Sequence, residues 1–94
     1  MSTEQQLFSH DVQSVDDIKK LNTAELVAFL VSKKQQLDLD DDDLKIIAPI
    51  FEKEKIKGTN IVKLTVDQLN ESGIPLGTAA NVLSFVEFLR GKGK

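Results

Sequence analysis

Five aspartates crowd the stretch LDLDDDDLKII, and carboxylates at this density are the ligands that Ca²⁺ prefers. Asp38, Asp40 and Asp42 would occupy the first, third and fifth places of a calcium-binding loop. The sixth place needs a glycine for its sharp turn but holds Asp43, and the twelfth needs a bidentate glutamate but holds Pro49. The pattern therefore fails at the two places where calcium geometry is most demanding.

The same aspartates fit the start of a helix. Asp40 stands at the position of an N-cap, and Asp41 to Asp43 would form an acidic first turn that the helix dipole stabilises. Leu39 and Leu44 flank this turn at the spacing of a hydrophobic staple. We therefore interpret the stretch as a helix start, and we expect no bound metal and no other cofactor.

A second candidate for chemistry is the corner GIPLGT, in which two glycines four residues apart flank a proline. A phosphate-binding loop would need a preceding strand or a lysine, and the sequence between Lys63 and Arg90 contains no basic residue. As a joint between helices, Gly73 would end one helix with a positive φ, Pro75 would set the approach to the next, and Gly77 would allow close backbone packing. A helix-hairpin-helix that binds the DNA backbone stays the alternative, although it too depends on cationic side chains.

Residues suited to acid–base or nucleophilic catalysis are sparse. His10 is the only histidine, and the chain has no cysteine. The carboxylates fall in helix caps and in solvated charged runs rather than in a buried pair. We therefore predict that the protein is not an enzyme.

Length and composition predict a single domain with a mostly aliphatic core. The chain has 94 residues, of which 40% are hydrophobic and 5% aromatic. No apolar run approaches the roughly 18 residues that span a membrane, and no signal peptide is recognisable, so we expect an intracellular location, cytoplasmic or nuclear. The net charge of -3 disfavours nucleic acid and anionic membranes as partners, because both require an excess of Lys and Arg.

The apolar spacing predicts five helices, of which the middle three are short. The first follows the capping pair Asn22 and Glu25. The second should kink or break near Ala48, with Pro49 starting the next turn, and should end at Gly58. The fourth should begin after the capping residue Thr65. The predicted helices cover, in order, about 23–34, 41–57, 59–64, 66–71 and 76–90.

The ends of the chain differ from this helical region. We expect residues 1–20 to form a flexible N-terminal arm and residues 91–94 a disordered tail, which leaves a helical domain over residues 21–90. On the last helix, Phe88 falls nearest the polar side. Either the arm or a partner would therefore cover this ring, and an apolar dimer through Phe88 is one form that such a partner could take.

From Leu21 to Arg90 the sequence resembles a sterile alpha motif (SAM) domain. The resemblance is carried by LNTAELVAFL, IFEKEKIKGTNIVKLTVDQLNESGI and PLGTAANVLSFVEFL. It implies an all-α fold, a compact five-helix bundle with a long C-terminal helix, and a function in binding other proteins. Leu21 stands where many members of the family have Trp. The family's core and corner positions would be held by Phe51, Ile56, Gly58, Leu64, Thr65, Leu69, Gly73, Ile74 and Gly77.

SAM domains commonly pair a surface of the middle helices with a surface at the start of the last helix. The resemblance therefore implies an acidic middle-helix face that binds a protein with a basic surface or another SAM domain, although the same carboxylates would also suit ordinary solvated helix ends. The start of the last helix lacks the Lys, Arg or His of family members that polymerise, so we expect weak homotypic polymerisation or none. The candidate partner-binding residues are Glu52, Glu54, Asp67 and Glu71 on the acidic face and Leu76, Gly77, Thr78 and Asn81 at the start of the last helix, with Phe88 as an apolar contact.

Binding of RNA or of the DNA backbone is the alternative function, because some SAM domains bind RNA. The missing basic patch disfavours it here. Its candidates are the lysines Lys53, Lys55, Lys57 and Lys63.

Overall fold

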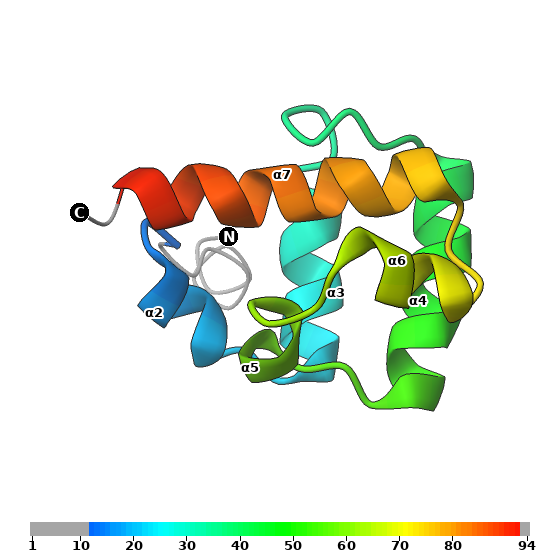
Figure 1. Cartoon of the computed structure of the whole chain (residues 1–94), viewed down its shortest axis with the longest axis horizontal. Coiled ribbons are helices and arrows are strands. Elements are labelled where there is room, and N and C mark those ends of the chain that lie inside the picture. The colour runs from blue at the N-terminus through cyan, green and yellow to red at the C-terminus, as the bar shows by residue number, and fades with distance from the viewer. Residues whose placement is uncertain (1–11, 93–94) are drawn as a thin grey trace, which may run out of the picture.

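The computed structural model describes residues 12–92, which form six helices joined by tight turns and contain no strand (Figure 1). The predicted all-α fold is confirmed. Five of the helices correspond to the five predicted ones, and α2 is additional. The helices are α2 (Val15–Lys19), α3 (Thr23–Ser32), α4 (Asp41–Glu54), α5 (Gly58–Ile61), α6 (Val66–Glu71) and α7 (Leu76–Lys92).

Reciprocal side-chain caps start three helices where the sequence predicts them. At α3 the Asn22 side chain accepts a hydrogen bond from the Glu25 N–H at 2.8 Å, and the Glu25 carboxylate accepts one from the Asn22 N–H at 2.9 Å. Asp40 and Asp43 form the same pair at α4, with distances of 2.8 and 3.1 Å, and a threonine–glutamine pair does so at α6. Each pair satisfies amide groups that a helix leaves open at its start. The interpretation of the aspartate stretch as a helix start is confirmed.

α4 differs from the predicted second helix because it has no break near Pro49 and because it ends earlier. It has 14 residues and continues through Pro49 without a break, because the burial of Ile47 and Phe51 outweighs the hydrogen bond that a proline cannot donate. It ends at Glu54, where Lys55 takes a left-handed conformation with φ 56. The predicted stop at Gly58 is therefore wrong, since Gly58 is the first residue of α5.

The corner between α6 and α7 is a joint between helices. Gly73 follows α6 with a φ of 113, a conformation that favours glycine, so this part of the prediction is confirmed. Gly77 has no atom within 4 Å of the place where a Cβ would stand. The prediction that Gly77 allows close backbone packing is wrong, because the first turn of α7 faces open space at this residue.

α7 is the longest helix and crosses α3 and α4 (Figure 1). Its contact with α3 includes Phe85, whose ring centroid lies 5.7 Å from that of Phe29. α6 also packs on α7, and α3 packs on α4. The centre is closed by large apolar side chains that are almost fully buried, namely Leu26, Ile47, Phe51, Ile61, Leu69, Ile74, Val82 and Leu89.

α2 lies within the region predicted to be a flexible arm. It packs on α5 and α7, and its Ile18 is only 1% exposed. Residues 12–20 therefore belong to the folded domain, because the apolar side of this short helix completes the core. Residues 1–11, which include His10, lie outside the described residues, as do residues 93–94, and α7 continues to Lys92.

Candidate functional site

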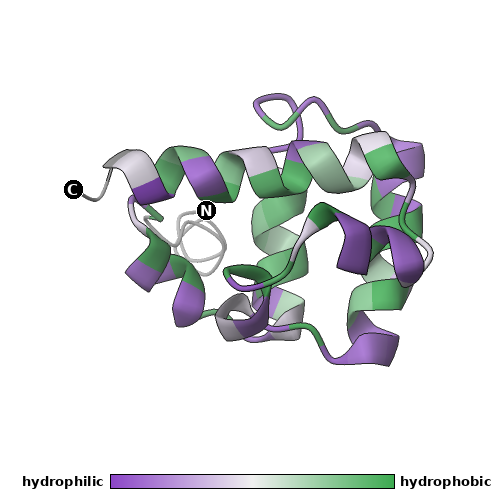
Figure 2. Cartoon of the chain, viewed as in Figure 1, coloured by the Kyte–Doolittle hydropathy of each residue, from purple (hydrophilic) through white to green (hydrophobic). Residues whose placement is uncertain are grey.

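The predicted acidic face is exposed and spans two helices. Glu52 and Glu54 lie in the last turn of α4, Asp67 and Glu71 lie four residues apart on α6, and all four are exposed. Figure 2 shows hydrophilic residues over α6 and at the ends of α4. None of the four carboxylates takes part in an ion pair within residues 12–92. Their charge is therefore directed to solvent.

Parts of α6 and of the residues that follow it lie near the second half of α4. Glu54 shares a shallow hollow with Gln68 and Ser72 of α6. At the far end of α6, a Cβ on Gly73 would lie 3.3 Å from the Ile50 side chain of α4. Glu54 of α4 is therefore near the side of α6 that carries Gln68.

The start of α7 is divided between exposed residues and residues that hold the fold together. Leu76 is 57% exposed, and Gly77 is exposed as well. Thr78 is only 7% exposed, and its hydroxyl donates a hydrogen bond to Asp43 Oδ1 at 2.9 Å. Asn81 donates through Nδ2 to the Asp38 carbonyl at 3.2 Å. Of the four candidate residues at the start of α7, Thr78 and Asn81 are thus held by hydrogen bonds to other parts of the fold, whereas Leu76 and Gly77 are exposed.

The Asp43 carboxylate joins the start of α4 to the start of α7. It accepts hydrogen bonds from the Asp40 N–H and the Thr78 hydroxyl, and these bonds hold the pKa of Asp43 below its ordinary value of 3.8. The charged form of this side chain therefore contributes to the fold. No group of His, Cys, Asp or Glu side chains within residues 12–92 is arranged to hold a metal ion.

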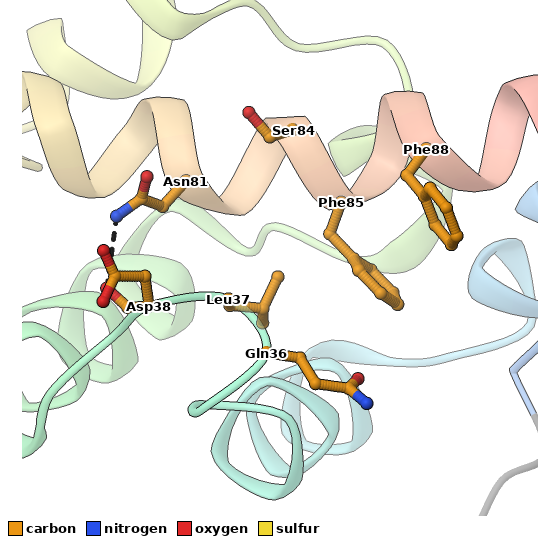
Figure 3. Close-up of a pocket in the computed structure, with 7 residues that line it drawn as sticks. All are labelled: Gln36, Leu37, Asp38, Asn81, Ser84, Phe85 and Phe88. Atoms are coloured by element: carbon orange, nitrogen blue, oxygen red, sulfur yellow. Dashed lines mark hydrogen bonds between the residues drawn. The ribbon is translucent and has the colours of Figure 1, made fainter.

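A groove that the sequence does not reveal lies between the α3–α4 loop and α7 (Figure 3). Its volume is about 450 Å³. Phe88, a contact residue predicted from the sequence, is 59% exposed and lines one end of the groove. No local pattern in the sequence predicts that residues of the α3–α4 loop line a groove with α7. The lining residues are Gln36, Leu37, Asp38, Asn81, Ser84, Phe85 and Phe88.

Residues 1–88 match the family described as the SAM-like domain, which is most of the chain. The chain belongs to this family. The predicted SAM resemblance is thereby confirmed, and the match to the family includes residues of the predicted arm.

The SAM-like chain is also similar to SEC23-interacting protein of Homo sapiens. The two are 37% identical over 79 residues, which cover 80% of this chain and 8% of that protein. The chain thus spans less than a tenth of the relative's length. No solved structure matches the chain.

The lysines of the alternative function lie at the end of α4 and around α5. Lys53, Lys55, Lys57 and Lys63 are all exposed. Glu52 and Glu54 alternate with Lys53 and Lys55 at the end of α4, so the surface carries both signs of charge. Within residues 12–92, none of the helices has the length and apolar character needed to cross a lipid bilayer.

Proposed function

We propose that this SAM-like domain is a protein-interaction module whose acidic face binds a protein with a basic surface. The observation that carries the proposal is the set of four exposed carboxylates on α4 and α6, none of which forms an ion pair within the described residues. Opposite charges across an interface accelerate encounter and select the partner. The acidic face is formed by Glu52, Glu54, Asp67 and Glu71.

The start of α7 is the second candidate surface, and its exposed part is small. Leu76 offers an apolar side chain, and Gly77 leaves the backbone accessible. Thr78 and Asn81 already bond to α4 and to the loop before it. We therefore propose that the acidic face provides most of the binding and that self-association through the start of α7 is weak.

SEC23 is the first partner to test, because the relative is by its name a SEC23-interacting protein. The chain and SEC23 would be mixed and analysed by light scattering on a sizing column. A complex that dissociates as salt is raised is the expected result, since exposed charge pairs are screened by ions. A complex that is insensitive to salt would contradict an acidic binding face.

Charge-reversal variants locate the surface in the same assay. We expect the pairs Glu52→Lys with Glu54→Lys, and Asp67→Lys with Glu71→Lys, each to weaken binding at least about tenfold. The matched control is Asp16→Lys with Glu87→Lys, which changes the net charge equally on α2 and α7. Equal loss in the control would show that overall charge, and not this face, decides binding.

A further inference from the structure

The groove between the α3–α4 loop and α7 has an aromatic end and an acidic end (Figure 3). We infer that it binds a peptide segment of another protein that carries a large apolar anchor and, three residues away, a Lys or Arg. This site goes beyond the acidic face proposed above, because it shares no residue with it.

The aromatic end is a row of rings that is already in place. Phe85 packs on Phe29 of α3 with centroids 5.7 Å apart, and the Phe88 ring follows at 6.1 Å from Phe85. Leu37 of the loop is buried and also lines the groove. Because Phe85 is held by the core, an apolar anchor would meet a preformed surface and would not have to order it.

The acidic end is formed by the loop. Asp38 is the only charged residue that lines the groove within residues 12–92, and its side chain is exposed. Its backbone has a φ of 58, and the Asn81 side chain holds its carbonyl. The nearest lysine in sequence, Lys34, bonds to Asp41 at 2.8 Å. A basic group on the peptide would therefore meet negative charge at this end.

The distance between the two ends sets the spacing on the peptide. Asn81, beside Asp38, and Phe88 are seven positions apart on α7, which corresponds to about 10 Å along a helix. An extended peptide covers about 10 Å in three residues. The anchor and the basic residue should accordingly be three positions apart.

The chain's own first residues match the groove less well. Residues 1–11 supply Leu7 and Phe8 as apolar anchors, but they contain neither Lys nor Arg and include Glu4 and Asp11. A second copy that packs groove to groove would bring its own Asp38 to the contact. Charge complementarity therefore favours a separate basic segment.

The probe is a capped octapeptide with one Phe and one Arg three positions apart in a Gly-Ser background, titrated into the ¹⁵N-labelled full chain. We expect backbone amide shifts at Leu37, Ser84 and Phe85. A second peptide with Glu in place of Arg should bind about threefold to fivefold more weakly, the ratio typical of an exposed charge pair. Shifts centred on α6, or equal binding of the two peptides, would overturn the inference.

Two variants and one control complete the test. Asp38→Asn keeps a residue that tolerates the left-handed backbone and should abolish the preference for Arg over Glu. Phe88→Ser should weaken both peptides at least about threefold, with the thermal melt confirming that the domain stays folded. Asp67→Asn, on the acidic face, should change neither the affinity for the peptides nor the preference for Arg over Glu. A failure of the groove proposal can therefore be told apart from a failure of the proposed function of the acidic face.

The other occupants give distinct results. If the peptides bind only after residues 1–11 are deleted, the chain's own segment occupies the groove. If the amides of Ser84 and Phe85 shift with protein concentration alone, a second copy does. Either result would overturn the inference.

Discussion

At the scale of the residue, two glycines of this domain have opposite environments. The Gly58 N–H donates to the Leu21 carbonyl at 2.9 Å, and a Cβ on Gly58 would overlap the Ile18 carbonyl. A Cβ on Gly77 would meet nothing within 4 Å. The same substitution should therefore have opposite effects at the two positions.

We expect Gly58→Ala to lower the free energy of unfolding by about 1–3 kcal/mol, because the added methyl group must push the backbone of α2 away from α5. Gly77→Ala should raise it by up to about 1 kcal/mol, because alanine has less backbone freedom to lose in a helix. Urea unfolding followed by circular dichroism measures both. A Gly58→Ala variant as stable as the wild type would show that α2 and α5 do not approach so closely.

A single substitution can also test the contribution of the Thr78 hydroxyl to stability. Thr78→Val keeps the shape of the side chain but removes the donor to Asp43. We expect the free energy of unfolding at pH 7 to fall by about 1 kcal/mol, the value of a partly exposed hydrogen bond to a charged group.

The pH dependence of this loss follows from the lowered pKa of Asp43. A carboxyl group with a lowered pKa in the folded state stabilises the fold above its ordinary value of 3.8, and this contribution is lost as the pH falls through the folded pKa. The difference between wild type and Thr78→Val should thus be constant above pH 3.8 and shrink below it. Urea titrations at several pH values test this, and a difference that grows in acid would contradict the assignment.

At the scale of the element, α2 is the helix whose contribution most needs a test. It has five residues, too few to be stable alone, so it is held by the burial of Ile18 against α5 and α7. Its Ser14 cap accepts a hydrogen bond from the Asp17 N–H at 3.3 Å. The helix therefore depends on tertiary packing and supports the core in return.

We expect Ile18→Ala to lower the free energy of unfolding by about 2–5 kcal/mol, the range for a large aliphatic side chain removed from a core. Asp16→Ala, on the exposed side of the same helix, should change it by less than about 0.5 kcal/mol. A chain shortened to begin at Leu21 should lose at least as much stability as Ile18→Ala. If it melts at the wild-type temperature, residues 12–20 are an arm as the sequence predicted.

At the scale of the whole molecule, the distribution of charge governs self-association. The chain has a net charge of -3, and α7 starts without a basic residue. Two copies that meet through their acidic faces would therefore bring like charges together, and like charges in an interface disfavour association.

We expect the molar mass of the domain, measured by light scattering on a sizing column, to remain that of a monomer over a concentration series at low and moderate salt. A mass that rises with concentration and falls with salt would show head-to-tail assembly. In that case Leu76→Asp should restore the monomer, because it places a charge at the exposed start of α7.

Much of the fold could be predicted because its signals are local. A cap pair such as Asn22 with Glu25 acts within one helical turn, and Gly73 ends a helix through its own backbone. The aspartate stretch was assigned correctly to a helix start for the same reason. The position of the exposed acidic residues on α4 and α6 also follows from helix periodicity.

The remaining features depend on contacts between residues far apart in the chain. Thr78, a predicted binding residue, donates a hydrogen bond to Asp43, 35 residues away, and so also supports the fold. The sequence predicts a helix stop at Gly58, but the role of this glycine is set by the approach of Ile18 from another helix.

The sequence by itself thus determined the α-helical class, most helix starts and the charge available for binding, because these depend on propensity, capping and composition. Only the tertiary structure decided that α2 belongs to the core, that α4 runs through Pro49 and that Leu37 faces Phe85 across a groove. Packing decides these features, since the burial of a side chain depends on every element that surrounds it.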